Sequence, residues 1–249
     1  MKVRMYNVGF GDCFCLRDRK KSLLVDFGTN NSRIEGRPRR EIFDVIISDL
    51  STIKSKNLLL THFHMDHLSG LLYMMKKKDI SVDFGKIYLP DVFSKKEMSR
   101  TLVLLLLADL LKESGLPSRQ VSLFALVDAL LENKQNVELL SRGKLFENKY
   151  QALWPDTDVI RKETDEVYNR ICEDGKFKEV MAVLLEFAEK LRLIVWSMTA
   201  EGNKPAETVE KETDLTASEL TEQPEVRQKI IRAYVYELSL IHISEPTRH

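Results

Sequence analysis

The chain has 249 residues, and its 38 basic and 38 acidic side chains balance, so the total charge does not indicate a polyanion-binding protein, although a balanced total can hide a local basic patch. Its length suits one large domain or one domain with an insertion, and its hydrophobic content of 43% is ordinary for a globular protein. The N-terminus lacks the apolar core of a signal peptide, and the longest apolar run, Leu102 to Leu111, is too short and interrupted to cross a bilayer, so no membrane contact is expected.

The first third of the chain is predicted to be rich in strands and tight turns. The segment KVRMYNV can form a strand, and turn glycines follow at Gly9 and Gly11. CFCLRD and SLLVDFG flank the charged turn DRKK, which predicts a β-hairpin. Five further segments are interpreted in order as a polar loop, a helix, a short buried strand running into a loop, a second helix and a strand closed by Pro90: TNNSRIEGRPRR, EIFDVIISDLSTI, NLLLTHFHMDH, LSGLLYMMKKK and VDFGKIYLPD.

The middle of the chain changes to helical periodicity. Apolar residues recur at three- and four-residue intervals from about Ser94 to Asn133, with turn signals at Gly115 and Pro117. KLFENKYQALWPD then resembles a short hairpin that ends at Pro155, and helix returns from about 163 to 193. The apolar stripes of these helices are interpreted as core rather than as a ligand-binding surface. Residues 200–225 are rich in Thr and Glu, which favours a flexible linker.

The last twelve residues, LSLIHISEPTRH at 238–249, resemble a translated sequencing adapter rather than a protein motif. Leu238 to Arg248 follow one reading frame of the transposon-end oligonucleotide used in library preparation, and the leftover base can begin the codon of His249. The alternative is a natural C-terminal strand, YVYELSLIHIS. With the adapter interpretation, residues 1–237 are expected to be a fragment of a longer protein, and His242 and His249 are excluded as ligands.

Three cysteines, Cys13, Cys15 and Cys172, form neither a zinc-type pair nor a disulfide framework. They are expected to be reduced in a cytoplasmic protein. Cys13 and Cys15 would face the same side of a strand, where small buried apolar residues are the simplest interpretation.

The segment THFHMDH, Thr61 to His67, holds three of the five histidines of the chain. Imidazole nitrogens and a carboxylate are suitable ligands for zinc and similar divalent metals. His62 and His64 are two residues apart, so both can reach one ion from an extended segment, and Asp66 and His67 can reach a second as the chain turns into a helix. Lys and Arg are absent from Leu58 to Met75, as a bound cation would favour.

The motif THFHMDHLSGL resembles the signature of the metallo-β-lactamase superfamily. VGFGDCFCL followed by LLVDFG resembles the N-terminal strands of its competence-type branch, in which a Val-Gly-x-Gly-Asp turn precedes a strand that ends in Asp-x-Gly. The resemblance covers residues 1–92 and, more loosely, an LWP strand near Trp154. It implies an α+β fold with an αββα sandwich, in which two sheets pack face to face with helices outside.

The resemblance also implies roles for individual residues. His62 and His64 would hold a first metal ion, and Asp66 and His67 a second, with Asp66 also the expected catalytic residue. Asp26 is expected to orient a ligand imidazole, and Asp12 to lie at the edge of the site. The alternative for both Asp26 and Asp12 is an ordinary turn carboxylate. The ions are expected to be two divalent metals, with zinc preferred and manganese as the alternative.

The chain departs from the family pattern downstream of the motif. Family members complete the site with a later His, a bridging Asp in a Gly-Asp turn and a final His, but no histidine lies between Leu68 and Glu237. Asp91, Asp156 and Asp158 are present, though none lies in such a turn. Since a two-metal site needs both ions about 3.5–4 Å apart, either the second half of the fold is missing or the protein is a degenerate member. The adapter-like tail favours the first explanation.

These patterns together predict a metallo-β-lactamase-like domain over 1–237, with the N-terminal half of the core at 1–92 and helical insertions at about 94–145 and 160–200. An unpaired sheet edge would make this fragment poorly soluble. The implied function is a hydrolase, with metal-bound hydroxide attacking an ester or phosphodiester of a small molecule or nucleic acid, and the fragment by itself is expected to be inactive. The alternative is a non-catalytic module that binds a protein partner through the helical insertions on a degenerate scaffold.

Overall fold

The structure is a computed structural model, and it describes residues 1–18, 21–77, 83–113, 123–173 and 175–200. The predicted linker at 200–225, apart from residue 200, and the adapter-like tail at 238–249 lie outside the described residues, as do the turn signals at Gly115 and Pro117.

A six-stranded mixed sheet organises the described chain. Its strands are β1 (Lys2–Met5), β2 (Phe14–Asp18), β3 (Lys21–Val25), β6 (Ser55–Leu59), β7 (Ile87–Pro90) and β8 (Val137–Leu140), and they lie in the order β1-β2-β3-β6-β7-β8. The pairs β1–β2 and β2–β3 are antiparallel, which confirms the hairpin predicted around DRKK, whereas β3–β6, β6–β7 and β7–β8 are parallel.

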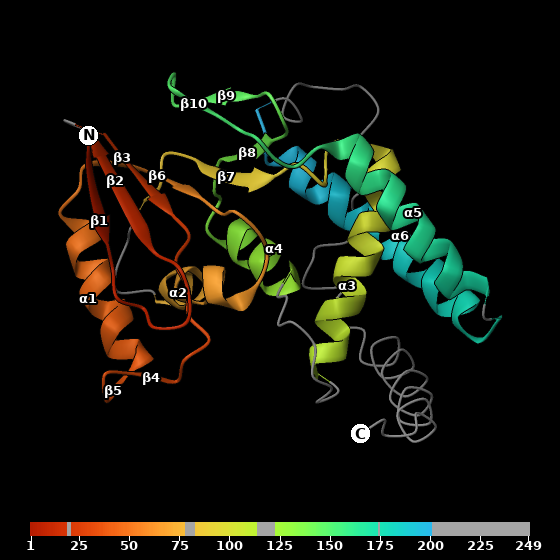
Figure 1. Ribbon diagram of the computed structural model, residues 1–249, viewed down its shortest axis with the longest axis horizontal. Helices are drawn as coiled ribbons and strands as arrows, with labels where there is room; N and C mark the ends of the chain where they lie inside the picture. The colour runs from red at the N-terminus through yellow and green to blue at the C-terminus, as the bar shows by residue number, and fades with distance from the viewer. Residues whose placement is uncertain (19–20, 78–82, 114–122, 174, 201–249) are drawn as a thin grey trace, which may run out of the picture.

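Helices connect and cover these strands (Figure 1). They are α1 (Arg39–Ser51), α2 (Met65–Lys76), α3 (Ser99–Glu113), α4 (Leu123–Glu132), α5 (Thr157–Glu173) and α6 (Gly175–Ser197), with a short 3-10 turn at Lys96–Met98. The helices α3, α5 and α6 pack side by side as a group, and α3 also contacts α4. The α+β class predicted from the sequence is confirmed.

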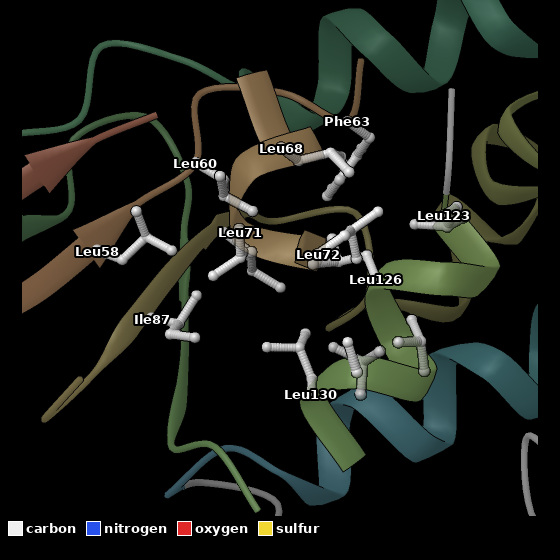
Figure 2. Close-up of a cluster of buried hydrophobic side chains, with 14 of the residues drawn as sticks. Leu58, Leu60, Phe63, Leu68, Leu71, Leu72, Ile87, Leu123, Leu126 and Leu130 are labelled. Carbon is white, nitrogen blue, oxygen red and sulfur yellow. The ribbon is translucent and has the colours of Figure 1, made fainter. Parts of the chain in front are cut away.

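The main core lies between one face of the sheet and the helices. Alternate strand residues such as Leu24, Leu58 and Ile87 point to this face and are fully buried. Figure 2 shows apolar side chains from β6, β7, α2 and α4 meeting here, among them Leu71 and Leu126. Apolar packing therefore holds the strand β6, which precedes the THFHMDH segment, against the helix α2, which begins within it.

The opposite face of the sheet carries a smaller apolar cluster, formed by Leu23, Tyr88, Leu140, Phe146 and Ala152. A two-stranded antiparallel sheet, β9 (Leu145–Phe146) with β10 (Tyr150–Gln151), covers this cluster. These two strands are the hairpin predicted in KLFENKYQALWPD. The edge strand β1 is exposed.

Four local features differ from expectation. The polar loop after residue 28 contains a minimal hairpin, β4 (Arg33–Ile34) with β5 (Arg37–Pro38). The 94–145 stretch, expected to be a helical insertion, also holds β8, which joins the central sheet, because its apolar run is short and β-branched at its start. Residues 152–155, including the LWP segment, are not a strand, and the helical region at 160–200 is divided into α5 and α6.

Among the described residues, no helix is long and apolar enough to cross a membrane.

Candidate metal centre

The THFHMDH segment follows β6 at the carboxyl end of the parallel strands. Val25 of β3 pairs in register with Leu59 of β6, so Asp26 emerges beside the start of the motif. The backbone N–H of Asp26 donates to the carbonyl of Leu59 over 2.8 Å. Asp26 has a left-handed φ of 54°, a conformation that aspartate tolerates better than most residues, and this turn aims its carboxylate at the motif.

The helix α2 begins at Met65, three residues before the predicted start at Leu68. Asp66 and His67 therefore lie in its first turn, with His64 as the N-cap residue. The carboxylate of Asp66 interacts favourably with the positive end of the helix dipole at this position.

The carboxylate of Asp26 is the organising group of the centre. It is 3% exposed, and its Oδ1 accepts from the backbone N–H of Thr61 over 2.8 Å. Its Oδ2 accepts from Thr61 Oγ1 over 2.7 Å and lies 2.9 Å from His67 Nδ1. His67 therefore donates from Nδ1, which leaves Nε2 with a free lone pair. This places Asp26 where the sequence expected an acceptor for a ligand imidazole.

Thr61 links Asp26 to a second imidazole, that of His62. Its hydroxyl hydrogen is used on Asp26, so Thr61 Oγ1 can only accept from His62 Nδ1, which lies 3.0 Å away. In the neutral ring of His62, the Nε2 atom consequently carries the lone pair. One buried carboxylate thus sets the tautomer of two histidines.

Potential ligand atoms converge around His67. Its Nε2 lies 3.6 Å from Asp12 Oδ2 and 3.7 Å from Asp66 Oδ2. The rings of His62 and His67 have centroids 3.6 Å apart, and the ring of His64 lies 4.7 Å from that of His62. Two overlapping groups have all their ligand atoms within 4.8 Å of one another, His62 with Asp66 and His67, and Asp12 with Asp26 and His67.

The first group joins His62 with Asp66 and His67. The assignment of His62 and His64 to one ion, and of Asp66 and His67 to a second, stays a prediction. Within the part of the chain that the structure describes, neither group includes a residue after His67. Asp91 accepts hydrogen bonds from Ser94, and Asp156 pairs with Arg142, so these later carboxylates are engaged elsewhere.

Three backbone segments meet beneath the site, and glycine permits their contact. A Cβ on Gly11 would lie 2.3 Å from the carbonyl oxygen of Gly28, and one on Gly28 would lie 2.6 Å from the backbone nitrogen of Leu68. Hydrogen bonds join the same segments, from Asp12 N–H to Asp66 O over 3.2 Å and from Phe27 N–H to His67 O over 2.7 Å. The glycines of GFGD and DFG therefore let Asp12 and Asp26 reach the first turn of α2.

The protonation of the two oriented histidines differs. Burial lowers the pKa of His62, and the neighbouring His67 and His64 lower it further. Burial also acts to lower the pKa of His67, but the hydrogen bond and negative charge of Asp26 outweigh it and raise that pKa. A cation bound at Nε2 would take the place of the proton that Asp26, Asp66 and Asp12 favour on His67.

Two residues of the centre were missed by sequence reasoning. Thr61 connects Asp26 to His62, and Ser69 donates from Oγ to the carbonyl of Thr29 while accepting from Thr29 N–H, both over 2.9 Å. The hydroxyl of Thr61 stands directly before the first histidine, which was the available signal. Ser69 carried no signal, because its partner lies 40 residues away.

The donor set fits a divalent metal. In their neutral forms two imidazoles offer Nε2 atoms beside the carboxylates of Asp12 and Asp66, and nitrogen and carboxylate oxygen are the ligands that zinc accepts. Among the described residues that form ion pairs, no lysine or arginine pairs with Asp12, Asp26 or Asp66.

Comparison with known proteins agrees with this chemistry. Residues 6–91 match the model of the metallo-beta-lactamase superfamily. Over 77 residues the chain is 32% identical to the Endoribonuclease YSH1 of Mycosarcoma maydis, an alignment that spans 31% of this chain and 8% of that protein. No solved structure matches the chain. The mixed sheet with its helices is consistent with the same fold family, and over residues 6–91 this chain is similar to the metallo-beta-lactamase superfamily.

Proposed function

We propose that the protein is a metal-dependent hydrolase with a dinuclear zinc site and a nucleic-acid phosphodiester as its substrate. The observation that carries the proposal is the Asp26 network. A buried carboxylate that directs His67 itself and His62 through Thr61 is the arrangement that fixes ligand imidazoles in metal sites.

Each residue then has a role. His62 and His64 contribute to one ion, Asp66 and His67 contribute to the other, and Asp12 lies at the edge, where its carboxylate is 43% exposed and can meet either an ion or the substrate. When bound, the ions lower the pKa of a water and stabilise developing negative charge on the substrate. Asp66, in the first turn of α2, would be the carboxylate that accepts a proton during the reaction.

The substrate class is supported by the related protein. That protein is named an endoribonuclease, and its similarity to this chain extends over 77 residues. The shared chemistry would be hydrolysis of a phosphodiester, for which two metal ions are a common solution. The alignment covers 8% of the related protein, so substrate and metal identity belong to the proposal alone.

A non-catalytic role on a degenerate scaffold is the second candidate. The shortage of ligands favours it, because the two ligand groups of the described residues draw on Asp12, Asp26, His62, Asp66 and His67 only. A protein-interaction module would need neither tight metal binding nor a poised acid–base group. Metal affinity therefore separates the two candidates.

The test is titration calorimetry with Zn²⁺ on the full chain. We expect binding that is lost in the double variants His62→Ala/His64→Ala and Asp66→Ala/His67→Ala, and kept in Asp158→Asn, a variant of an exposed carboxylate on α5. Binding that does not depend on these four residues would refute the metal site. The chain by itself is expected not to hydrolyse bis(p-nitrophenyl) phosphate, and metal-dependent turnover abolished by Asp66→Ala would contradict that expectation while supporting the reaction class.

A further inference from the structure

A group of arginines without acidic partners lies on one short segment of the surface, where Arg33 donates only to the backbone carbonyl of Gly36. The hairpin β4–β5 and the first turn of α1 carry Arg33, Arg37, Arg39 and Arg40 within eight residues. In the part of the chain that the structure describes, none of the four forms an ion pair, whereas Arg4, Arg17, Arg100, Arg142 and Arg192 all do. The balanced total charge of the protein therefore hides a local basic patch.

The patch adjoins the candidate metal centre. The turn Gly9 to Asp12 connects them, because a Cβ on Gly9 would lie 3.4 Å from Ile34 of the hairpin while Asp12 lies 3.6 Å from His67. Three residues of chain span at most about 11 Å. Figure 1 shows β4 and β5 at the end of α1, which they contact.

One exposed aromatic side chain belongs to the turn Gly9 to Asp12. Phe10 is 70% exposed, yet its backbone is held on both sides. Its N–H donates to Asn31 Oδ1 over 3.1 Å, and its carbonyl accepts from Asn30 N–H over 2.9 Å and from Thr29 Oγ1 over 3.2 Å. A firmly held turn thus presents an aromatic ring to solvent, beside a basic patch.

The arginines do not serve the stability of α1. Arg39 and Arg40 occupy its first turn, where positive charge opposes the helix dipole, and the N-cap residue Pro38 offers no side-chain hydrogen bond. Two negative side chains lie in the same segment, Glu35, which accepts from Asn7 Nδ2 over 2.7 Å, and Glu41 in the first turn of α1. Between residues 33 and 41 four positive charges therefore outnumber two negative charges.

We propose that Phe10 and the arginines of the β4–β5 hairpin and of the first turn of α1 form a binding surface for single-stranded nucleic acid, with arginines on phosphates and the Phe10 ring stacked on a base, next to the His/Asp centre. This surface rests on the proposed function for its substrate class. Arginines that contact the backbone together with an exposed aromatic ring are the two elements by which proteins hold single strands without reading their sequence.

The test measures binding without cleavage. A fluorescent twelve-nucleotide oligouridylate is titrated with the full chain in EDTA, and anisotropy gives Kd at several salt concentrations. For Arg37→Gln/Arg40→Gln we expect Kd to rise about tenfold or more and the slope of log Kd against log salt to fall by about 1.4, because two phosphate contacts are lost. Arg37→Lys/Arg40→Lys keeps the charge and should retain most of the binding.

The matched control is Arg161→Gln/Arg170→Gln on α5, which removes the same charge from exposed positions and should leave Kd within about twofold. Phe10→Ala should weaken RNA binding about fivefold or more while leaving the weaker binding of polyglutamate unchanged. Unchanged affinity in Arg37→Gln/Arg40→Gln, an equal loss in the α5 control, or polyglutamate bound as tightly as RNA would each overturn the proposal.

A parallel Zn²⁺ titration keeps this proposal separate from the hydrolase. Arg37→Gln/Arg40→Gln should bind zinc like the unaltered chain, because neither arginine contacts the centre. If the unaltered chain does not bind zinc but the variants change RNA affinity as expected, the proposed hydrolase function is refuted and the proposed RNA-binding surface is retained.

Discussion

The carboxylate of Asp26 lies 2.9 Å from Nδ1 of His67, across 41 residues of sequence. Because Asp26 also accepts two hydrogen bonds from Thr61, three donors share one buried carboxylate. The centre is therefore organised by a residue outside the histidine motif. Variants of Asp26 test the orientation of the histidines while leaving His62 and His67 themselves in place.

Asp26→Asn should weaken zinc binding about 10- to 100-fold. The amide keeps the size of the side chain but offers one acceptor atom to donors that now use two, so His67 or Thr61 loses its partner. Competition with a zinc-binding dye gives the affinity. Asp158→Asn, at an exposed carboxylate, serves as the control, and zinc affinity unchanged in Asp26→Asn would contradict the role given to Asp26.

Thr61→Val should lower zinc affinity by about tenfold, because it leaves His62 Nδ1 without an acceptor while preserving the shape of the side chain. Thr61→Ser restores the hydroxyl and should restore the affinity. The same dye competition measures both. Equal weakening in the two variants would show that Thr61 acts through packing of its methyl group instead.

Gly28→Ala should destabilise the fold by about 1–3 kcal/mol, because its Cβ would lie 2.6 Å from backbone atoms of Asp66 and Leu68 that cannot move without shifting α2. Gly175→Ala is the matched control, since nothing lies within 4 Å of its Cβ, and it should stabilise the fold by up to about 1 kcal/mol. Urea unfolding followed by circular dichroism distinguishes them, and a neutral Gly28→Ala would be inconsistent with the close contact.

Asp128→Asn should stabilise the protein at pH 7. Burial raises the pKa of Asp128 above its ordinary value of 3.8, and Glu132 one turn later adds to the rise. A raised pKa means that the folded state binds the proton more tightly, so stability is fully present below pH 3.8 and falls as the pH rises through the folded pKa. The gain in melting temperature at pH 7 should therefore vanish near pH 3, and Glu132→Gln should give a smaller gain of the same sign.

Arg40→Gln should stabilise the protein by about 0.3–1 kcal/mol, because it removes a positive charge from the first turn of α1. Arg170 provides the opposite case in the last turn of α5, where its charge is favourable, so Arg170→Gln should destabilise by a similar amount. Thermal unfolding at low salt measures both. Loss of stability in Arg40→Gln would mean that this arginine supports the fold.

The sequence by itself determined the local features. The spacing of THFHMDH, the β2–β3 hairpin, and the helices α1, α2 and α4 all depend on residues within a few positions of one another, and the structure contains each of them. The α+β class and the superfamily of residues 6–91 were also predicted from short motifs and agree with the fold and the comparison. Periodicity and turn residues suffice here because the relevant contacts are short-range.

Only the tertiary structure decided which distant residues meet. It hydrogen-bonded Asp26 to His67 and to Thr61, which in turn contacts His62, gathered Asp12 with His67, made β8 the sixth strand of the sheet, and brought Gly9 against Ile34 of the β4–β5 hairpin. These relationships depend on how separate strands stack and on close backbone contacts at Gly11 and Gly28. No local pattern encodes such contacts, because packing between segments tens of residues apart depends on the whole fold.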